Sequence, residues 1–487
     1  MSSKATDTLK NAVAKSFLWG GLSNAVCQLL TAFFGVYLAR LLGPEDYGPV
    51  GMLAIFNAIA TSLQDSGFVA AIANRKTVSH DDYNAVFWFS IITSFVIYGL
   101  LYAGAPLIAE FFNQPVLLWL ARFNLLAFVL NGFGVAFSAY LFRELKVKQR
   151  SIASVLALFV SGISGILLAM NGYSYWGIST QAIIYTLVRL LVYWYYTPWR
   201  PTLKVKFYPL RYLFAFSHKL LITNIFQKIN WNVFSIVLGK YYNRADVGNY
   251  SKSADWFRMG SDMVNVMVNT VAQPVLARVV DDNERQLRIF RKMMRFTAFV
   301  SFPLLFGLSL VSYEFIVVLL TDKWVESARM LQILCLWGAF MPIQSMFTNL
   351  LISCGRTNAF MWSTIAQGTL LLLMLLLMRS LGVKPMLLAY CIFNIAWLFL
   401  WCVLAKRDIS ITIRMFVADF MPYLAVSLAA MLLTAIMTYS IDNLCVLLCV
   451  RIVVAAVLYV ALCYICRFEE ISESVNYLFK RKVKGDK

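Results

Sequence analysis

The chain has 487 residues, of which 60% are hydrophobic, 15% aromatic and only 14% charged, and its formal net charge is +19. This composition excludes an ordinary soluble domain and predicts an all-α polytopic membrane protein. The sequence contains only two histidines, so a histidine-based catalytic site is not expected. We predict a transporter rather than an enzyme, with no cofactor and no metal site.

Fourteen segments are long and apolar enough to predict transmembrane helices. In chain order they are 17–39, 47–72, 84–109, 116–142, 151–170, 176–196, 219–239, 247–273, 296–320, 327–352, 360–381, 385–405, 420–440 and 445–466.

Lysine and arginine gather at the N-terminus, in every second loop and in the C-terminal tail, whereas the alternate loops hold few. The positive-inside rule then places both termini in the cytoplasm. The same rule accounts for the high net charge. A nucleic-acid partner is not expected, because charge spread over many loops does not form one basic face.

Two hairpins repeat at an offset of two hundred residues. The first reads ARLLGPEDYG at 39–48 and the second reads GKYYNRADVG at 239–248. Six helices separate them, so both copies enter the membrane in the same orientation, as a parallel repeat. The sequence therefore predicts two six-helix lobes plus a helix pair, with boundaries at 1–207, 208–406 and 407–487, the last part including a basic cytoplasmic tail.

The segment from Val247 to Pro274 has an ionisable stripe. Spacings of three and four residues place seven polar side chains on one helical face: Lys252, Asp255, Arg258, Asp262, Asn265, Asn269 and Gln273. A charged residue facing lipid at mid-bilayer costs about 2.5–3.5 kcal/mol, so this face should line protein or water. The stripe therefore indicates a transport pathway, with structural charge pairing as the alternative.

Weaker polar faces occur on three other spans. They contain Asn24 and Gln28 in the first, Asn57, Gln64 and Asp65 in the second, and Lys228 in the seventh. With the stripe, these residues are expected to line a central cavity between the lobes. Each amide has an alternative as interhelical contact, which is the role we expect for Asn124 and Asn131. Four arginines near span ends are expected to snorkel: Arg122, Arg189, Arg329 and Arg451.

The hairpins carry a family resemblance. LARLLGPEDYGPVGM at 38–52, followed by QDSGF at 64–68, resembles the first hairpin of bacterial polysaccharide and O-antigen flippases, and VGNYSKSADW at 247–256 and QPVL at 273–276 agree with it. These flippases are the Wzx-type branch of the multidrug/oligosaccharidyl-lipid/polysaccharide (MOP) exporters, which share a fold with the MATE transporters. The resemblance implies that an undecaprenyl-diphosphate-linked oligosaccharide crosses the bacterial cytoplasmic (inner) membrane by alternating access through a cationic cavity. It also implies possible coupling to protons or sodium.

The residue pattern and the resemblance suggest specific roles. Arg258 and Lys252 are expected to bind the diphosphate, with Lys228, Asn265 and Asn269 in the same cavity. Asn24, Gln28, Asn57 and Gln64 are expected to bind sugar hydroxyls. Asp65, Asp255 and Asp262 are expected to pair with the cations or carry a coupling proton. Sodium coupling is in doubt, because the seventh, eleventh and twelfth spans offer Asn224, Gln367 and Asn394 but no carboxylate.

Two other functions remain open. A MATE-like, cation-coupled drug exporter has the same fold and is compatible with Asp65. A membrane transferase is disfavoured by the short outer loops and the lack of paired catalytic carboxylates. The expected partners are the lipid-linked oligosaccharide, membrane lipids and polysaccharide assembly proteins. The sequence determines neither the sugar composition nor the oligomeric state.

Overall fold

The computed structural model describes residues 2–65, 72, 78–204, 208–280 and 282–470. Within this range the chain is helical and has no strand. It forms two compact units, an N-terminal unit at Met1–Gly248 and a C-terminal unit at Asn249–Lys487. Ten helical segments of the described residues are long and apolar enough to cross a membrane. The all-helical, multi-pass character predicted from the sequence is thus confirmed.

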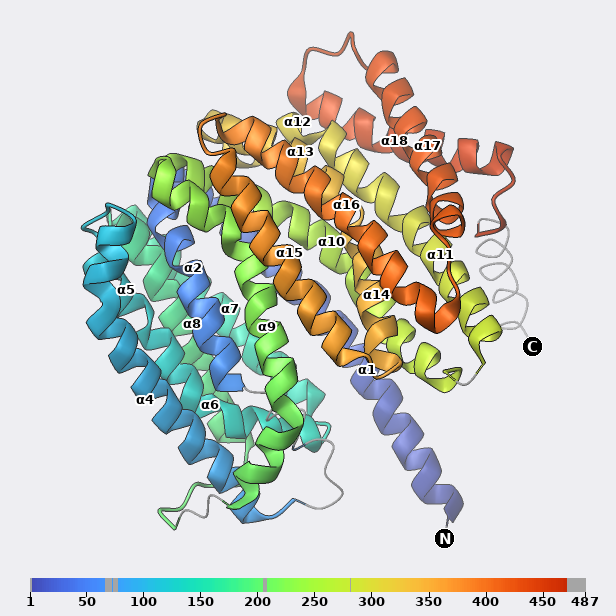
Figure 1. The fold of residues 1–487 in the computed structure, drawn as a ribbon. Helices are drawn as coiled ribbons and strands as arrows, with labels where there is room; N and C mark the ends of the chain where they lie inside the picture. The colour runs from blue at the N-terminus through green and yellow to red at the C-terminus, as the bar shows by residue number, and fades with distance from the viewer. Residues whose placement is uncertain (1, 66–71, 73–77, 205–207, 281, 471–487) are drawn as a thin grey trace. The chain divides into compact units, whose positions relative to one another are not determined.

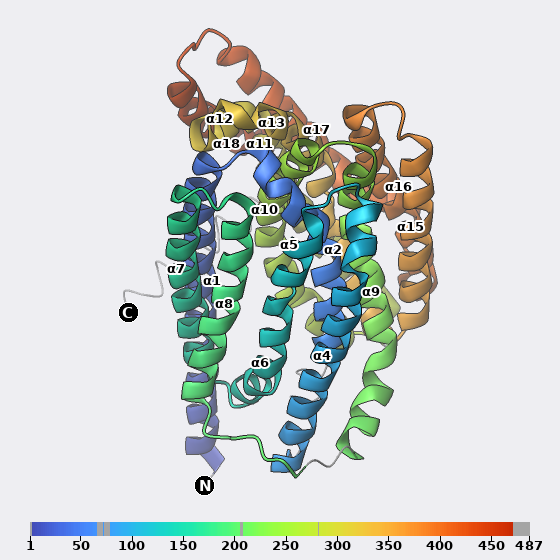
Figure 2. The ribbon, with the colours of Figure 1, turned by 90° about the vertical axis from the view of Figure 1, so that its left-hand side faces the viewer.

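The N-terminal unit is a bundle of long helices (Figure 1). α1 packs along α7, α7 along α8, and α4 along α6, as the side view in Figure 2 also shows. The helices of this unit are α1 (Ser2–Leu41), α2 (Pro44–Asp65), α4 (His80–Phe111), α5 (Leu117–Asn124), α6 (Leu126–Arg143), α7 (Val147–Met170), α8 (Ser174–Tyr196) and α9 (Tyr208–Tyr241).

The C-terminal unit contains most of α10, which begins at the end of the N-terminal unit. In this unit α11 packs against α17, α17 against α18, and α13 against α16. The elements are α10 (Arg244–Arg278), α11 (Asn283–Leu310), α12 (Ser312–Leu320), the 3₁₀ turn η1 (Asp322–Trp324), α13 (Val325–Gly338), α14 (Met341–Ser353), α15 (Thr357–Leu377), α16 (Val383–Ile409), α17 (Ile413–Met437) and α18 (Leu444–Ile465).

Within the described residues each predicted span falls on a helix, but three spans are interrupted. The fourth is divided into α5 and α6, the ninth into α11 and α12, and the tenth into α13 and α14. A break inside a membrane leaves backbone groups without helical partners, and each unsatisfied group is costly in hydrocarbon. The fold therefore needs other side chains to form hydrogen bonds with the free backbone groups at these breaks.

The break between α13 and α14 shows how the backbone is satisfied. Pro342 has no N–H, so it cannot bond the carbonyl of Gly338 four residues earlier. The Ser261 hydroxyl of α10 donates to this carbonyl at 2.8 Å, and the Ser301 hydroxyl of α11 donates to the carbonyl of Ala339 at 2.7 Å. The break thus ties α10 and α11 to the broken helix.

α11 uses a similar contact at its own proline. Pro303 lies inside the helix and leaves the carbonyl of Phe299 without its usual donor. The Tyr459 hydroxyl of α18 donates to this carbonyl at 2.8 Å. The proline therefore weakens the helix internally while it creates an attachment point for α18.

The hairpins α1–α2 and α9–α10 are built alike. α1 ends at Leu41 and α2 begins at Pro44, while α9 ends at Tyr241 and α10 begins at Arg244. Both connections therefore have the same length and lie two hundred residues apart.

The beginnings of α2 and α10 approach each other at two glycines. A Cβ on Gly48 would overlap the carbonyl oxygen of Arg244, and a Cβ on Gly248 would overlap the carbonyl oxygen of Pro44. All four residues belong to the N-terminal unit. Only glycine allows this close, reciprocal backbone contact.

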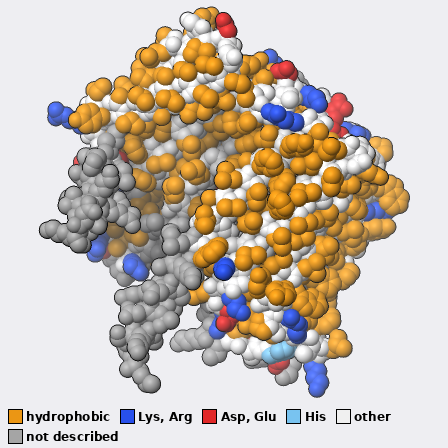
Figure 3. Space-filling view, turned by 180° about the vertical axis from the view of Figure 1, so that it is seen from behind, with side chains coloured by type: hydrophobic (Ala, Val, Ile, Leu, Met, Phe, Trp, Pro, Cys, Tyr) orange, Lys and Arg blue, Asp and Glu red, His pale blue; other side chains and the backbone are white. Residues whose placement is uncertain are grey.

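Large apolar side chains cover much of the molecular surface. On the face drawn in Figure 3, they form a broad area, and lysine and arginine lie mainly towards its margins. Exposed examples from several helices include Leu29, Leu100, Leu107, Leu377, Leu432 and Val457. A surface of this kind is stable in lipid and would aggregate in water.

Candidate functional site

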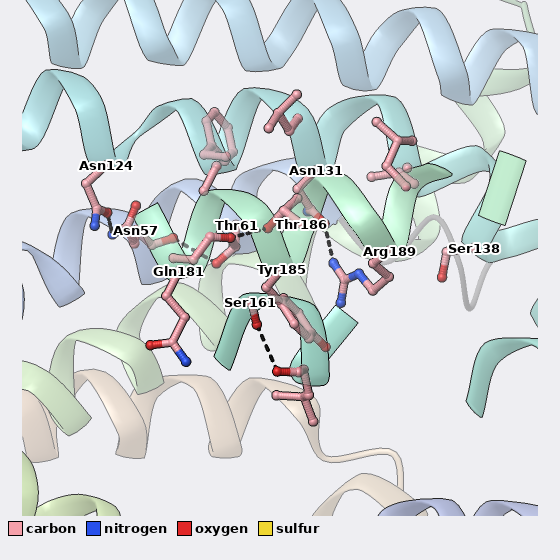
Figure 4. A pocket seen from close by; sticks show the side chains of 18 of the residues that line it. Asn57, Thr61, Asn124, Asn131, Ser138, Ser161, Gln181, Tyr185, Thr186 and Arg189 are labelled. Carbon is pink, nitrogen blue, oxygen red and sulfur yellow. Dashed lines mark hydrogen bonds between the residues drawn. The ribbon is translucent and has the colours of Figure 1, made fainter. Parts of the chain in front are cut away.

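A cavity of about 1060 Å³ lies inside the N-terminal unit, where α2, α6, α7 and α8 line most of its wall (Figure 4). We call it the polar cavity. Its polar lining residues are Asn57, Thr61, Asn124, Asn131, Ser138, Arg150, Ser161, Gln181, Tyr185, Thr186, Arg189 and Tyr193. None of the described residues lining it is Asp or Glu, so its fixed charge is positive.

A first hydrogen-bond network lies at one end of the polar cavity. Asn57 of α2 donates to the side-chain oxygen of Asn124 at the end of α5, and Asn124 donates to the Ser179 hydroxyl of α8 at 3.0 Å. Asn124 is buried, so its amide forms hydrogen bonds with these two side chains instead of with water. The predicted interhelical role of Asn124 is confirmed, and Asn57 takes part in the same contact.

A second network surrounds Gln64, which is fully buried. Its amide nitrogen donates to the Ser94 hydroxyl at 2.5 Å and to the carbonyl of Phe128 at 3.0 Å, while its amide oxygen accepts from Asn131. Gly132 permits this packing, since a Cβ there would overlap the Ser94 hydroxyl and lie 2.9 Å from the Gln64 amide nitrogen. The amide of Gln64 is therefore engaged within the unit, and Asn131 acts as an interhelical contact, as predicted.

Arg189 differs from the sequence prediction that it would snorkel. It lines the polar cavity, and its Nη2 donates to the side-chain oxygen of Asn131 at 2.7 Å (Figure 4). Its guanidinium lies 5.3 Å from the ring centre of Tyr185 and 6.0 Å from that of Tyr193, on the preceding and following turns. The spacing of four residues from Gln181 through Tyr185 to Arg189 is the sequence signal that could have revealed this face.

The first half of the predicted stripe lies on α10 in the C-terminal unit. Lys252 is buried and Asp255 is exposed, and Asp255 interacts electrostatically with both Lys252 and Arg258. Arg258 is also close enough to the phenols of Tyr250 and Tyr390 to interact with both, and Tyr390 belongs to α16. The cations are thus neighbours of a carboxylate and of two phenols.

The second half of the stripe contacts α14. The Asn269 side-chain oxygen accepts hydrogen bonds from Ser345 at 2.9 Å and from Asn349 at 2.6 Å. Asp262 is exposed and accepts a long hydrogen bond of 3.4 Å from Asn265. Asn269 therefore has an interhelical role besides any contact with substrate.

The packed face of α10 was not evident from the sequence. It contains Phe257, Val264 and two serines, and Ser253 donates to the carbonyl of Ser327 at 2.7 Å, as Ser261 does to that of Gly338. Small hydroxyl residues suit helix contacts in lipid because they let backbones approach and supply a donor. The polar stripe flanks this face.

The remaining predicted cavity residues lie in the N-terminal unit. Asn24 is exposed and Gln28 is partly exposed on α1, and the Lys228 ammonium of α9 lies 5.1 Å from the ring centre of Trp231. The side chains of Asp65 and Gln273 lie outside the described residues. That these groups and α10 share one central cavity stays a prediction.

A second cavity, of about 580 Å³, lies in the C-terminal unit, and we call it the apolar cavity. α10, α11, α12, α17 and α18 line it, with Met263, Met267, Phe299, Leu304, Met431 and Val460 among its residues. Its wall is largely hydrocarbon, which suits an aliphatic chain rather than sugars.

Arg451 is the charged group in the wall of the apolar cavity. Its Nη1 forms an ion pair of 2.6 Å with the buried carboxylate of Glu314, and its Nε donates to the Thr438 hydroxyl at 3.2 Å. The prediction that Arg451 snorkels is wrong, because its guanidinium pairs with a buried carboxylate inside the unit.

Comparisons with known proteins agree with the fold. The lipopolysaccharide biosynthesis protein WzxC of Escherichia coli (strain K12) is 23% identical over 357 residues, which are 72% of this chain and 72% of that protein. A solved structure of the lipid II flippase MurJ in an inward closed conformation has a TM-score of 0.69 at 15% identity, covering 92% of this chain and 98% of its own.

An inward-facing multidrug resistance MATE family transporter of the MOP superfamily has a TM-score of 0.65 at 15% identity, covering 79% of this chain and 94% of its own. The chain therefore has the fold shared by MurJ and the MATE transporters. A family model described as polysaccharide biosynthesis protein matches residues 37–329, which is more than half of the sequence. As the Wzx-type resemblance of its hairpins implied, the chain belongs to this polysaccharide biosynthesis protein family.

Proposed function

We propose that this protein is a flippase that moves an undecaprenyl-diphosphate-linked oligosaccharide across the bacterial cytoplasmic membrane by alternating access. One observation carries the proposal. On α10, Met263 and Met267 line the apolar cavity, while Arg258 and Asp262 lie along another side of the same helix. A substrate with a charged head and a hydrocarbon tail needs both environments next to each other.

The comparisons support the same substrate class. The matched family is a polysaccharide biosynthesis family, and the Escherichia coli relative is named for lipopolysaccharide biosynthesis. The solved structures that share the fold are named as a flippase and a transporter rather than as enzymes. A flippase for a lipid-linked intermediate of polysaccharide biosynthesis agrees with both the biosynthesis names and the transporter names.

The direct test measures the substrate in each leaflet. In cells that lack this gene, the fraction of lipid-linked oligosaccharide accessible to a membrane-impermeant reagent should fall, and the intermediate should accumulate inside. The wild-type gene should restore the outer fraction. An unchanged outer fraction in the deletion strain would contradict the proposal.

The proposed topology has fourteen spans, two six-helix lobes at 1–207 and 208–406, and a helix pair at 407–487, with both termini in the cytoplasm. The matching hairpins α1–α2 and α9–α10 support a parallel repeat. The compact units divide later, at Gly248, because α9 packs against α2. Reporter fusions after Lys148, Lys292 and Lys406 should all report cytoplasm, and a periplasmic signal at one of them would break the assignment.

Arg258 is the proposed diphosphate contact on α10, with Lys252 as a second cation. Arg258→Lys should keep partial flipping, because the charge remains while the bidentate geometry is lost. The nearby carboxylate of Asp255 provides the control for a purely structural arginine. If Arg258 only holds that carboxylate, the double variant Arg258→Ala with Asp255→Ala should flip normally, whereas a substrate contact predicts a folded but inactive variant.

Coupling and assembly complete the proposal. Asp255 and Asp262 are the proposed carriers of a coupling proton. Sodium coupling is disfavoured, because Gln367 and Asn394 form a buried amide pair of 3.0 Å and offer no carboxylate. Polysaccharide assembly proteins are the proposed partners.

A MATE-like drug exporter is the second candidate, and the fold of the matched MATE transporter favours it. The charge of the polar cavity argues against it. Two arginines and no described carboxylate line that cavity, which repels organic cations. Export of a cationic dye that depends on this gene would favour the drug exporter.

A further inference from the structure

We propose that the polar cavity of the N-terminal unit is a binding site for an oxyanion of the glycan substrate, with Arg189 as its anchor. The oxyanion is a phosphate or a sugar carboxylate, since both present the same paired oxygens to a guanidinium. This inference rests on the proposed function for its substrate class and adds a second site, away from α10.

Among the residues that the structure describes, none supplies a counter-ion for the charge of Arg189. Within the described residues its acceptor is the neutral amide of Asn131, and no carboxylate pairs with it. An arginine inside a membrane-spanning bundle is costly, and it normally pairs with an acid or faces a ligand pathway. One engaged N–H leaves further guanidinium donors available to an anion in the cavity.

A chain of hydrogen bonds fixes the position of Arg189. Asn131 accepts from Arg189 through its oxygen and donates to Gln64 through its nitrogen, so the orientation of its amide is determined. Gln64 is itself anchored by Ser94 and by the carbonyl of Phe128. A donor held in place before binding loses little entropy when the anion arrives, which favours affinity.

The rest of the cavity matches a carbohydrate. Its volume of about 1060 Å³ lies at the upper end of ordinary ligand pockets, so it has room for more than a single ion. Asn57 and Gln181 lie at one end and Ser138 beyond Arg189 at the other, with Tyr185 between them (Figure 4). Amides and hydroxyls suit sugar hydroxyl groups, and an aromatic ring suits the apolar face of a sugar.

Arg150 adds a second positive charge. It also lines the cavity, and its buried Nε has no hydrogen-bond partner among the described residues. It stands near the beginning of α7, the end of the helix that the proposed topology places at the cytoplasmic side. The cavity therefore has cations positioned for a substrate that enters from the cytoplasm.

The test uses the purified full-length protein in lipid nanodiscs and three soluble probes. Inorganic pyrophosphate represents the diphosphate linkage, a galacturonic acid trimer represents acidic sugars, and maltotriose is the neutral control. We expect wild-type protein to bind at least one anionic probe more tightly than maltotriose. The preferred anion then distinguishes the two sources.

Two variants separate binding from structure. Arg189→Gln should weaken binding of the anionic probe by about tenfold or more, the effect of losing one charge-assisted hydrogen bond. Asn131→Asp should have a similar effect while the protein stays folded, because the new carboxylate would pair with Arg189 and occupy it. A purely structural arginine would leave probe binding unchanged in both variants.

Arg122→Gln is the matched control. Arg122 belongs to the same unit, but it stacks on the rings of Tyr102 and Trp119 and does not line the cavity. This variant should bind the probes like wild type. Equal binding of maltotriose and the anions, or unchanged anion binding in Arg189→Gln, would overturn the inference. Neither result depends on the leaflet assay, so failure of this site and failure of the proposed function are distinguishable.

Discussion

Two arginines, Arg189 and Arg451, line the cavities of the two units and have opposite surroundings. Arg451 meets the buried carboxylate of Glu314 at 2.6 Å, whereas the hydrogen-bond acceptor of Arg189 among the described residues is the neutral amide of Asn131 at 2.7 Å. An arginine whose charge is already compensated holds helices together. An arginine left without a carboxylate is maintained at a cost in stability, which an anionic ligand can offset.

The largest expected effect comes from breaking the pair in the C-terminal unit. Arg451→Met leaves the Glu314 carboxylate buried without its partner, and it should lower the free energy of unfolding by about 3–5 kcal/mol. The measurement is denaturant unfolding of the purified protein in detergent.

The control removes both charges. Arg451→Met with Glu314→Leu should recover most of the lost stability, because an apolar pair can replace a buried ion pair. A double variant as unstable as the single one would show that the ion pair is not the reason for the loss.

The next largest effect on stability is expected at Gly132, which gives room to the hydrogen bonds that hold Arg189. Gly132→Ala places a methyl group against Ser94 and Gln64, so it should cost about 1–3 kcal/mol of unfolding free energy and weaken anion binding. Gly104→Ala on α4 meets nothing within 4 Å and should be neutral or slightly stabilising. If both alanines behave alike, Gly132 does not position the network.

A smaller effect on the free energy of unfolding is expected when Arg189 itself is replaced. Arg189→Gln leaves no carboxylate behind, so the free energy of unfolding should change by no more than about 1 kcal/mol. The same denaturant measurement compares it with Arg451→Met. A loss as large as that of Arg451→Met would remove the distinction between the two arginines.

The smallest effect is expected on α17, beside the apolar cavity. Thr434 donates to the carbonyl of Ala430 in its own helix at 2.7 Å, so Thr434→Ala removes a hydrogen bond within α17 and not one between helices. Together with Ser427→Ala it should leave flipping nearly intact, because α17 belongs to the helix pair outside the two proposed lobes. Complete loss of flipping with normal folding would place α17 in the transport pathway.

The sequence predicted helix positions well, because long apolar segments and basic loops are strong signals. It did not predict where spans break. The break after Gly338 depends on hydroxyls from Ser261 and Ser301, which are far away in sequence. Backbone partners supplied by other helices cannot be read from the segment that needs them.

The candidate site was predicted in part. The polar stripe on α10 follows from helical spacing, and the interhelical roles of Asn124 and Asn131 were anticipated. Arg189 was missed, because its position near the end of a span suggested snorkelling. The direction that a long side chain takes depends on its neighbours, here Asn131 on α6, rather than on its depth alone.

The glycine crossing of α2 and α10 has a mechanical consequence. At Gly48 and Gly248 main chain rests on main chain, so at these two positions no side chain stands between the helices. Because each copy of the hairpin supplies one glycine, a wedge inserted at either position would push on the other hairpin in the same way.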